Sequence, residues 1–187
     1  MNPVSRDGAR LRLRELRKED AEAVFAIYGS AAATAHLSFE PRTFDQVRGI
    51  VQRAIASAQE TPRAEYVLAV LDPQQELVGF GRLALDPHQP RAATFGFALR
   101  PSVWGRGYGL ETVELLLGLA FDELELHRVW GARAPENTAS ARTMAAAGMV
   151  EEGIIREHIT KRGRWRDSVV HAILEREWRA RCTDARW

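Results

Sequence analysis

Three glycines at every second position, Gly105, Gly107 and Gly109, are the residues whose type and spacing most directly suggest chemistry. Glycine inside a regular helix or strand costs about 0.5–1 kcal/mol relative to alanine, so this spacing predicts a tight turn. An apolar run over residues 94–99 precedes the glycines, and apolar residues recur at helical spacing from Leu110 onward. A turn between a strand and a helix leaves backbone N–H groups without intrahelical partners, at the positive end of the helix dipole. The stretch therefore predicts a binding site for an anion such as a phosphate.

Two common phosphate-binding motifs do not fit this turn. Counted from Gly105, the dinucleotide fingerprint needs glycine or alanine at the sixth position, which here is Leu110. The P-loop needs a lysine where the helix begins, and the turn contains no lysine. The segment instead resembles the pyrophosphate loop of the GNAT superfamily of N-acetyltransferases, Gln/Arg-x-x-Gly-x-Gly/Ala. On this chain the pattern runs from Trp104, which departs from the consensus, to Gly107 and Gly109.

Two further segments resemble the RimJ/RimL-like branch of that superfamily, which acetylates ribosomal-protein N-termini. Residues 135–142 (Pro-Glu-Asn-Thr-Ala-Ser-Ala-Arg), followed by residues 148–153 (Gly-Met-Val-Glu-Glu-Gly), are similar to its Asn-x-x-Ser-x-Arg and Gly-Phe-x-x-Glu-Gly block. Residues 163–167 (Gly-Arg-Trp-Arg-Asp) match its Gly-x-Trp-x-Asp hairpin. Because three motifs occur in the family's order, the chain is identified as a member of the GNAT superfamily.

The resemblance implies a site for acetyl-CoA. Unpaired backbone groups around Phe97 and Leu99 would receive the pantetheine arm like an added strand. Amides of the glycine turn would take the diphosphate, Asn137 would bond both the cofactor and a strand, and Arg142 would reach a phosphate. The residues implied in cofactor binding are Phe97, Leu99, Trp104, Gly105, Arg106, Gly107, Tyr108, Gly109, Leu110, Asn137 and Arg142.

Direct acetyl transfer needs a neutral amine, a donor to the oxyanion and an acid for the departing thiolate. Many relatives carry a Glu two residues before the strand glycine, but this chain has Thr94 before Gly96, and threonine cannot act as a base. Many relatives also use a Tyr in the helix after Asn137. No tyrosine occurs there, so Ser140 is the candidate acid. A backbone N–H near Leu99 is expected to bind the oxyanion.

The identity of the general base is left open. An α-amine has a pKa of about 7.7–8.0 and is partly neutral at pH 7, whereas a lysine amine, at about 10.4, needs a real base. An N-terminal acceptor therefore relaxes the demand, and the base is His36, Glu40 or His158, acting directly or through water, or there is none. Residues 31–41 and 161–164 are expected to contact the acceptor. The candidate substrate-binding side chains are His36, Phe39, His158 and Trp165.

Structural explanations compete with these roles. The glycines could form only a turn, and Asn137 and Ser140 are residue types that occur at helix N-termini. A chain without the usual Glu and Tyr could also be a CoA-binding regulatory module that has lost turnover. Cys182, expected in a C-terminal tail, argues against an acyl-cysteine intermediate. The prediction remains an N-acetyltransferase that moves an acetyl group from acetyl-CoA to a protein N-terminus or a small-molecule amine.

The elements that must position these residues are those of a single α/β (α+β) domain over residues 1–187. A strand, helix and strand in succession around the glycine turn leave the two strands parallel. The resemblance implies a GNAT fold, with a mixed central sheet of about seven strands, a splayed pair and about four flanking helices. Strands are expected at 11–16, 66–71, 77–85, 92–99, 127–133, 150–160 and 165–175, helices after 18–20, 43, 109 and 135, and a loop at 31–41.

Composition limits the remaining possibilities. The 187 residues are 45% hydrophobic and 27% charged, which suits one folded domain. A net charge of +1 provides no global field for a nucleic acid, and no stretch could cross a bilayer. The single cysteine allows no disulfide framework within the chain and no cysteine metal cluster. We expect a cytoplasmic monomer or homodimer that uses acetyl-CoA and an amine acceptor, without a metal, nucleic acid, membrane or signal peptide.

Overall fold

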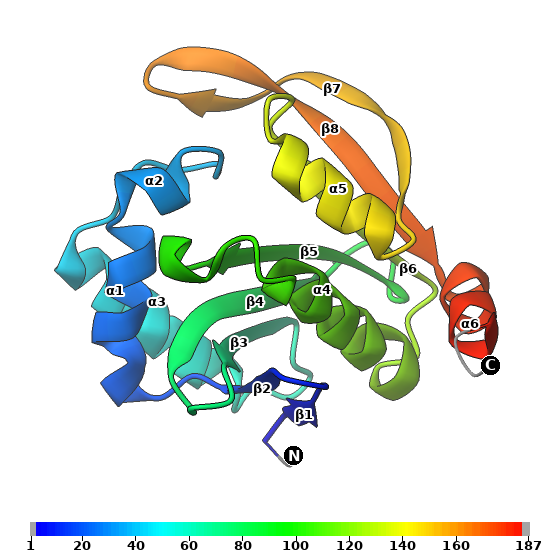
Figure 1. The fold of residues 1–187 in the computed structure, drawn as a ribbon, viewed down its shortest axis with the longest axis horizontal. Coiled ribbons are helices and arrows are strands. Elements are labelled where there is room, and N and C mark those ends of the chain that lie inside the picture. Colours follow the sequence, from blue (N-terminus) through cyan, green and yellow to red (C-terminus); the bar gives the residue numbers. More distant parts are fainter. Residues whose placement is uncertain (1–2, 185–187) are drawn as a thin grey trace.

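A mixed eight-stranded sheet, with the strand order β1-β2-β3-β4-β5-β6-β8-β7, runs through the centre of the protein. The computed structural model describes residues 3–184 and is shown as a ribbon in Figure 1. All neighbouring strands are antiparallel except β5 and β6, which are parallel as the crossover predicts. The strands are β1 (Ser5–Asp7), β2 (Arg12–Glu15), β3 (Glu65–Leu71), β4 (Leu77–Leu85), β5 (Ala92–Leu99), β6 (Arg128–Arg133), β7 (Val150–Lys161) and β8 (Arg164–Leu174).

Helices cover both faces of the sheet. One face packs against α1 and α3, and the opposite face packs against α4, α5 and α6. Three short helical turns, η1 (Lys18–Asp20), η2 (Pro101–Val103) and η3 (Leu119–Glu123), adjoin α1, the glycine turn and α4. The helices are α1 (Ala21–Tyr28), α2 (Ala31–Thr34), α3 (Phe44–Ser57), α4 (Tyr108–Gly118), α5 (Thr138–Ala146) and α6 (Glu175–Asp184).

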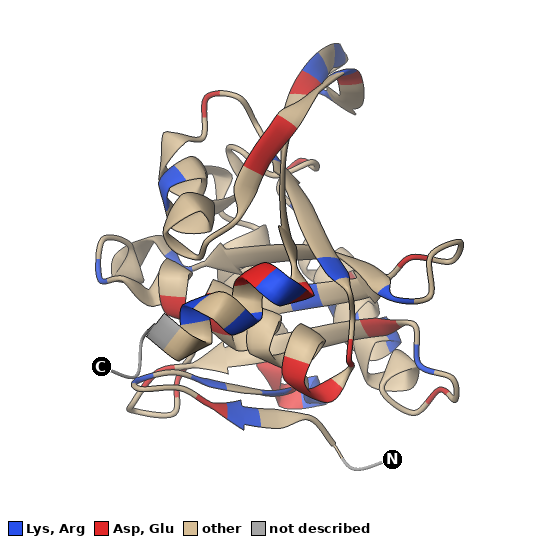
Figure 2. Ribbon diagram, turned by 90° about the vertical axis from the view of Figure 1, so that its right-hand side faces the viewer, with Lys and Arg blue, Asp and Glu red and all other residues tan. Residues whose placement is uncertain are grey.

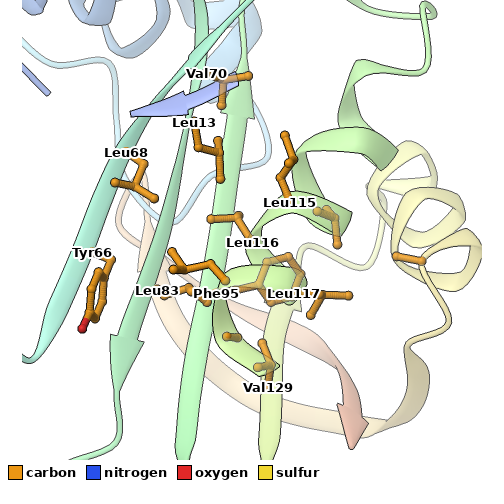
Figure 3. Close-up of a cluster of buried hydrophobic side chains, with 14 of the residues drawn as sticks. Leu13, Tyr66, Leu68, Val70, Leu83, Phe95, Leu115, Leu116, Leu117 and Val129 are labelled. Carbon is orange, nitrogen blue, oxygen red and sulfur yellow. The ribbon is translucent and has the colours of Figure 1, made fainter. Parts of the chain in front are cut away.

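The alternation of side chains along β3 divides the core into two clusters. Leu68 and Val70 join the cluster beneath α4, whereas Ala69 and Leu71 join the cluster beneath α1 and α3. Figure 3 shows the first cluster, to which α4 contributes three consecutive leucines, Leu115–Leu117. Since α4 is buried on nearly all sides, it is a rigid support for the turn that precedes it.

Helix boundaries follow the local signals of the sequence closely. Thr43 caps α3, and its hydroxyl accepts from the Gln46 amide while the Gln46 side chain accepts from the Thr43 amide. The helix expected from residues 18–20 to Tyr28 forms as η1 and α1 and ends at Gly29. These predictions are confirmed.

Two segments differ from expectation at the N-terminal side of the chain. The expected single strand 11–16 is accompanied by β1, which pairs with β2 from Ser5 to Asp7. These polar residues carry no hydrophobic alternation, so their pairing through the backbone leaves no pattern in the sequence. The segment 31–41, expected as a loop, begins with one helical turn, α2, capped by Ser30, whose hydroxyl accepts from the Ala33 amide at 3.3 Å.

The C-terminal residues form a helix that was not predicted. Trp178 of α6 is buried, its ring lies 6.1 Å from the Phe121 ring, and its indole N–H donates to Asp122 at 3.1 Å. This tertiary contact anchors a helix whose remaining residues are mostly polar. Cys182, expected in a tail, therefore lies exposed on α6. The sheet and helix counts both exceed those implied by the resemblance, while the mixed fold class is confirmed.

The two strands of the β7–β8 hairpin are longer than the other strands of the sheet, and the hairpin projects away from them (Figures 1 and 2). Figure 2 also shows that acidic and basic residues are interspersed over the elements in view. None of the helices between residues 3 and 184 is both long and apolar enough to cross a membrane. Within the same residues, no group of three or more His, Cys, Asp or Glu side chains is arranged to hold a metal ion.

Candidate active site

The glycine turn lies between β5 and α4, as the sequence predicted. Gly105 and Gly107 have positive φ angles of 76° and 78°, which only glycine adopts without steric cost. Gly109 differs from the prediction, because α4 begins at Tyr108 and Gly109 lies in its first turn. A Cβ on Gly109 would lie 3.5 Å from the Thr143 hydroxyl of α5, so the two helices are in contact at this point.

The backbone of the turn presents a continuous series of amides. Within residues 3–184, none of the N–H groups of residues 105–110 donates a hydrogen bond to a protein acceptor. Gly107 is the N-cap of α4 and supplies no side chain to satisfy them. Residues 104–107 are exposed, so these donors face solvent at the positive end of the α4 dipole. The arrangement suits a ligand with several negatively charged oxygens.

Trp104 fastens the turn to the end of β5. Its indole N–H donates to the Leu99 carbonyl oxygen at 2.9 Å, although about half of the side chain, 52%, is exposed. The Leu99 carbonyl is therefore occupied, which leaves the Leu99 N–H as the backbone group available at this residue. The departure from the consensus at the first position of the loop motif thus has a structural role.

Strands β5 and β6 separate beside the turn, as expected for a splayed pair. Their parallel pairing covers only Ala92–Thr94 against Arg128–Trp130. The Arg100 N–H donates to Val78, and because antiparallel bonds alternate, the backbone groups of Phe97 and Leu99 are directed away from β4 and toward the gap. An extended ligand segment can therefore pair with Phe97 and Leu99 as a strand would.

Helix α5 begins on the β6 side of the gap. Asn137 caps it, since the side-chain oxygen accepts from the Ser140 amide at 3.0 Å while the Asn137 N–H donates to Ala134. This leaves the side-chain NH2 group of Asn137 and the Ser140 hydroxyl without partners in the described part of the chain. Both side chains are half-buried, and Arg142, one turn further, is exposed.

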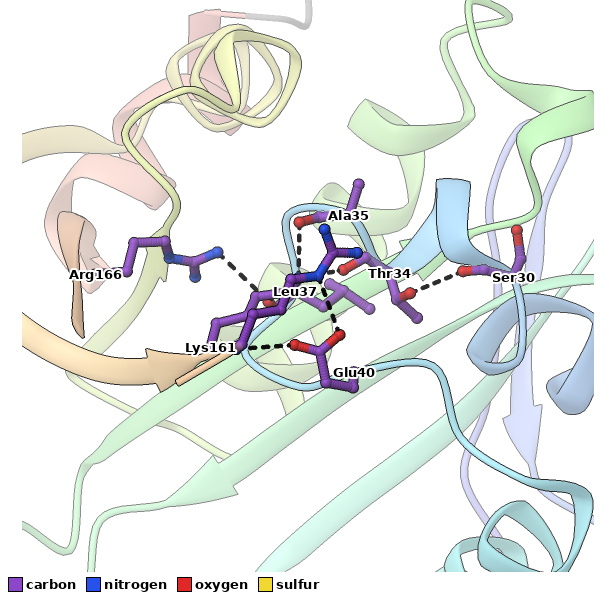
Figure 4. A network of polar contacts seen from close by, with 8 residues as sticks. Ser30, Thr34, Ala35, Leu37, Glu40, Lys161 and Arg166 are labelled. Atoms are coloured by element: carbon purple, nitrogen blue, oxygen red, sulfur yellow. Dashed lines mark hydrogen bonds and ion pairs between the residues drawn. The ribbon is translucent and has the colours of Figure 1, made fainter. Parts of the chain in front are cut away.

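The tip of the β7–β8 hairpin contacts the end of α2 and the segment that follows it. Lys161 Nζ donates to the carbonyl oxygens of Thr34, Ala35 and Leu37 at 2.6, 2.7 and 2.9 Å (Figure 4). Burial against these groups lowers the pKa of Lys161. Arg166 adds longer contacts, of 3.3 and 3.4 Å, to the His36 and Leu37 carbonyls. The segment 34–40 and the hairpin tip therefore form one arch, which we call the Lys161 arch.

The four predicted substrate residues and Glu40 are all on the two segments of the arch or on the hairpin. Glu40 accepts from the Arg162 N–H at 3.1 Å and pairs with its guanidinium at 3.5 Å, so a structural contact occupies this candidate base. The Phe39 ring packs edge-on against Tyr28, with centroids 4.8 Å apart, which indicates a structural role. The side chain of His36 is exposed.

His158 and Trp165 lie on the hairpin, and both are exposed. The β7–β8 pairing is irregular between Ile155 and Ile159, and Asp167 accepts there from the Glu157 N–H at 2.7 Å. Asp167 thus holds the irregularity that carries His158. Which of these exposed side chains contacts an acceptor stays a prediction.

Two residues of the site, Arg10 and Glu111, were missed in the sequence, and Lys161 was expected only as part of the acceptor-contacting segment 161–164, without its contacts to segment 34–37. Arg10 donates through Nη1 to the Arg106 carbonyl at 2.8 Å and through Nε to Glu111 at 2.9 Å. An acidic residue in the first turn of a predicted helix was the available signal for Glu111. Arg10 and Lys161 act across more than 90 residues of sequence, and no local pattern marks them.

Comparisons with known proteins relate this geometry to a family. The family model described as an acetyltransferase (GNAT) domain matches residues 10–150. The chain is 26% identical over 170 residues to the uncharacterized N-acetyltransferase p20 of Bacillus licheniformis, covering 90% of this chain and 95% of that protein.

Solved structures show the same fold. Spermidine N-acetyltransferase from Vibrio cholerae in complex with CoA and spermine superposes with a TM-score of 0.80 at 25% identity, covering 91% of this chain and 99% of that one. Mycobacterium smegmatis RimJ in complex with CoA-disulfide superposes with a TM-score of 0.81 at 23% identity, covering 98% of this chain and 93% of that one. The latter likeness concerns the fold alone.

Proposed function

We propose that this chain, which belongs to the GNAT acetyltransferase family and is an acetyl-CoA-dependent N-acetyltransferase, acetylates the α-amino group of a peptide or protein N-terminus. The observation that carries the cofactor side of the proposal is the run of six amides, residues 105–110, that have no acceptor among residues 3–184 and lie beside the gap between β5 and β6. Those amides bind the diphosphate, and the backbone of Phe97 pairs with the pantetheine arm, which leaves the Leu99 N–H for the oxyanion. Such positioning of the thioester can contribute about 7–11 kcal/mol to lowering the barrier.

The transfer is direct. The lone pair of the amine attacks the thioester carbonyl, and the Leu99 N–H donates to the oxyanion that forms. When the oxyanion collapses, the carbon–sulfur bond breaks and the carbon–nitrogen bond remains. The amine loses its proton to water, to His36 or to His158, and the Ser140 hydroxyl protonates the departing thiolate. The Ser140 hydroxyl is free for this role because only the Ser140 backbone N–H takes part in the Asn137 cap.

The acceptor enters beside the Lys161 arch. Lys161, Arg162 and Arg166 give the arch an excess of positive charge, with Glu40 paired to Arg162. A polycation would be repelled there, whereas a peptide N-terminus carries one amine whose pKa, about 7.7–8.0, leaves a neutral fraction at pH 7. These charges favour peptides with neutral or acidic residues after the first position.

A polyamine is the second candidate acceptor. It is favoured by the likeness to the spermidine N-acetyltransferase of Vibrio cholerae, whose structure covers 91% of this chain. The two acceptors differ sharply in charge, so a direct competition between them separates the candidates.

The test is an assay of free thiol released from acetyl-CoA. The acceptors are peptides with neutral, acidic or basic residues after the N-terminal residue, together with spermidine and free amino acids. We expect the highest kcat/KM with the neutral and acidic peptides, and mass spectrometry should place the acetyl group on the α-amine. Faster turnover of spermidine would favour the second candidate. Binding of CoA without thiol release for any acceptor would contradict the proposal and indicate a regulatory module.

A further inference from the structure

The turn between β1 and β2 is tied to the first turn of α4 by the buried side chain of Glu111. One carboxylate oxygen accepts from the N–H groups of Arg10 and Leu11 at 2.6 and 2.8 Å, and the other accepts from the Arg10 side chain at 2.9 Å. Only 9% of Glu111 is exposed. A buried carboxylate is costly unless it is hydrogen-bonded, and these donors lower the pKa of Glu111 despite its burial. The side chain is therefore an anion that fixes the backbone around Arg10.

The Arg10 guanidinium uses two of its nitrogens at once. Nε donates to Glu111, and Nη1 donates to the carbonyl of Arg106, the residue between the two left-handed glycines. Its Nη2 lies 3.2 Å from the position that a Cβ on Gly107 would occupy. The forked shape of arginine lets two separate nitrogens reach the two partners, whereas a lysine concentrates its three donors on a single nitrogen.

The bond to the Arg106 carbonyl controls the direction of a neighbouring donor. That carbonyl and the Gly107 N–H belong to the same planar trans peptide, so they point in opposite directions. Holding the carbonyl toward Arg10 directs the Gly107 N–H to the other side of the turn. Glycine loses more conformational freedom on ordering than any other residue, so a turn with two such glycines gains most from an external hold.

We propose that Arg10, held by Glu111, is a positioning residue that orders the glycine turn before the CoA diphosphate binds. The inference rests on the proposed function, since it takes residues 105–110 as the diphosphate site. Ordering the turn in advance removes that entropy loss from the binding step. Arg10 therefore acts on the affinity for the cofactor through the Arg106–Gly107 peptide.

The test measures CoA binding by calorimetry for wild type, Arg10→Lys and Arg10→Gln. Arg12→Gln is the matched control, because Arg12 belongs to the same hairpin and, among residues 3–184, pairs only with Asp7. We expect both Arg10 variants to bind CoA about tenfold more weakly, as the loss of a hydrogen bond from a charged group implies, and the control to bind normally. The KM for acetyl-CoA should rise in parallel, while kcat and the acceptor KM stay at wild-type values.

A second readout is the ordering of the turn itself. NMR order parameters for the Gly105 and Gly107 amides should lie near 0.85, the value of a rigid backbone, in the unliganded wild type and fall toward 0.6 in both Arg10 variants. The same amides should stay ordered in Arg12→Gln. Unchanged order parameters in Arg10→Gln would contradict the inference, whatever the binding data show.

The remaining outcomes separate this inference from the proposed function. Wild-type affinity in Arg10→Lys would overturn it, because a lysine can supply charge but lacks the two separate nitrogens that reach Glu111 and Arg106. If the Arg10 variants lose both kcat and thermal stability, Arg10 acts in folding alone, and this result would also overturn the inference. If Gly107→Val weakens CoA binding but Arg10→Gln does not, only the positioning role fails. If Gly107→Val also binds CoA with wild-type affinity, the assignment of residues 105–110 as the diphosphate site is wrong.

Discussion

The proposed cofactor side and the proposed acceptor side of the site are built in different ways. The cofactor side uses backbone groups of β5, the glycine turn and α4, which follow one another within residues 92–118 and rest on the core. The acceptor side uses the segment 34–40 and a hairpin tip more than 120 residues away, joined by side-chain donors and backbone carbonyls at the surface. A backbone site tolerates little variation in its ligand, whereas the Lys161 arch can change its side chains without disturbing the sheet.

Because the two sides are built differently, we expect variants of each side to change different kinetic constants. Changes in the glycine turn should act on the binding of acetyl-CoA, and changes in the arch should act on the acceptor. Ser140 lies at the start of α5, the helix that contacts both α4 and β7, and should act on the chemical step.

The largest effect is expected at this serine. Ser140→Ala removes the proposed acid, and kcat should fall about a hundredfold with both KM values retained, as for the loss of general acid catalysis. Thr138→Ala is the matched control, because Thr138 carries an exposed hydroxyl at the beginning of the same helix. Steady-state kinetics across pH provide the measurement. Full turnover by Ser140→Ala would rule out the acid role and leave only the amide that completes the Asn137 cap.

A variant in the glycine turn should break the cofactor side alone. Gly107→Val places a β-branched residue at a φ of 78° and brings its Cβ within 3.2 Å of Arg10. The affinity for acetyl-CoA, measured by calorimetry, should fall by more than about tenfold, because the N–H donors of the turn are displaced.

Gly49→Ala is the control for that variant. Gly49 lies inside α3, where a Cβ would meet only the end of the Arg53 side chain, at 3.4 Å. This substitution should leave acetyl-CoA binding unchanged and stabilise the helix by about 1 kcal/mol. Equal affinities for both glycine variants would show that the turn does not bind the diphosphate.

The acceptor side should respond to loss of the Lys161 ammonium. Lys161→Met removes three charged hydrogen bonds and loosens the hairpin tip from segment 34–40, although the contacts of Arg162 and Arg166 remain. The KM for a peptide acceptor should rise about tenfold, with the KM for acetyl-CoA unchanged. Lys18→Met is the control, since Lys18 is exposed on η1. A matching rise in both KM values would mean that the two sides are not independent.

The smallest effect concerns stability on the cofactor side. Because the pKa of folded Glu111 lies below its ordinary value of 4.5, the unfolded state binds more protons, and stability from this group is present above that value and lost as the pH falls. Glu111→Gln should lower the free energy of unfolding by about 1 kcal/mol at pH 7.

Urea unfolding at pH 7 and pH 3 gives the measurement. The difference between wild type and Glu111→Gln should shrink at the lower pH, as wild-type Glu111 becomes protonated. Glu114→Gln, one turn along the same helix and more exposed, should show a smaller difference at both pH values. A difference that persists unchanged at pH 3 would contradict an ionised role for Glu111.

Local patterns predicted most of the regular elements. The cap at Thr43, the glycine that ends α1 and the two αL glycines before α4 each act through the backbone within a few residues, so their effect is visible in the sequence. Elements held by distant contacts were missed. Strand β1 pairs through polar residues, and α6 is anchored by Trp178 on Phe121.

The sequence by itself determined the glycine turn, the crossover that leaves β5 and β6 parallel, and the helix that Asn137 caps, because backbone conformation and hydrophobic spacing are local properties. Only the tertiary structure decided which side chains converge on them. Arg10 reaches Arg106, and Lys161 reaches Thr34, across separations of 96 and 127 residues. Such contacts form when the sheet order brings the segments together, and no spacing along the chain encodes them.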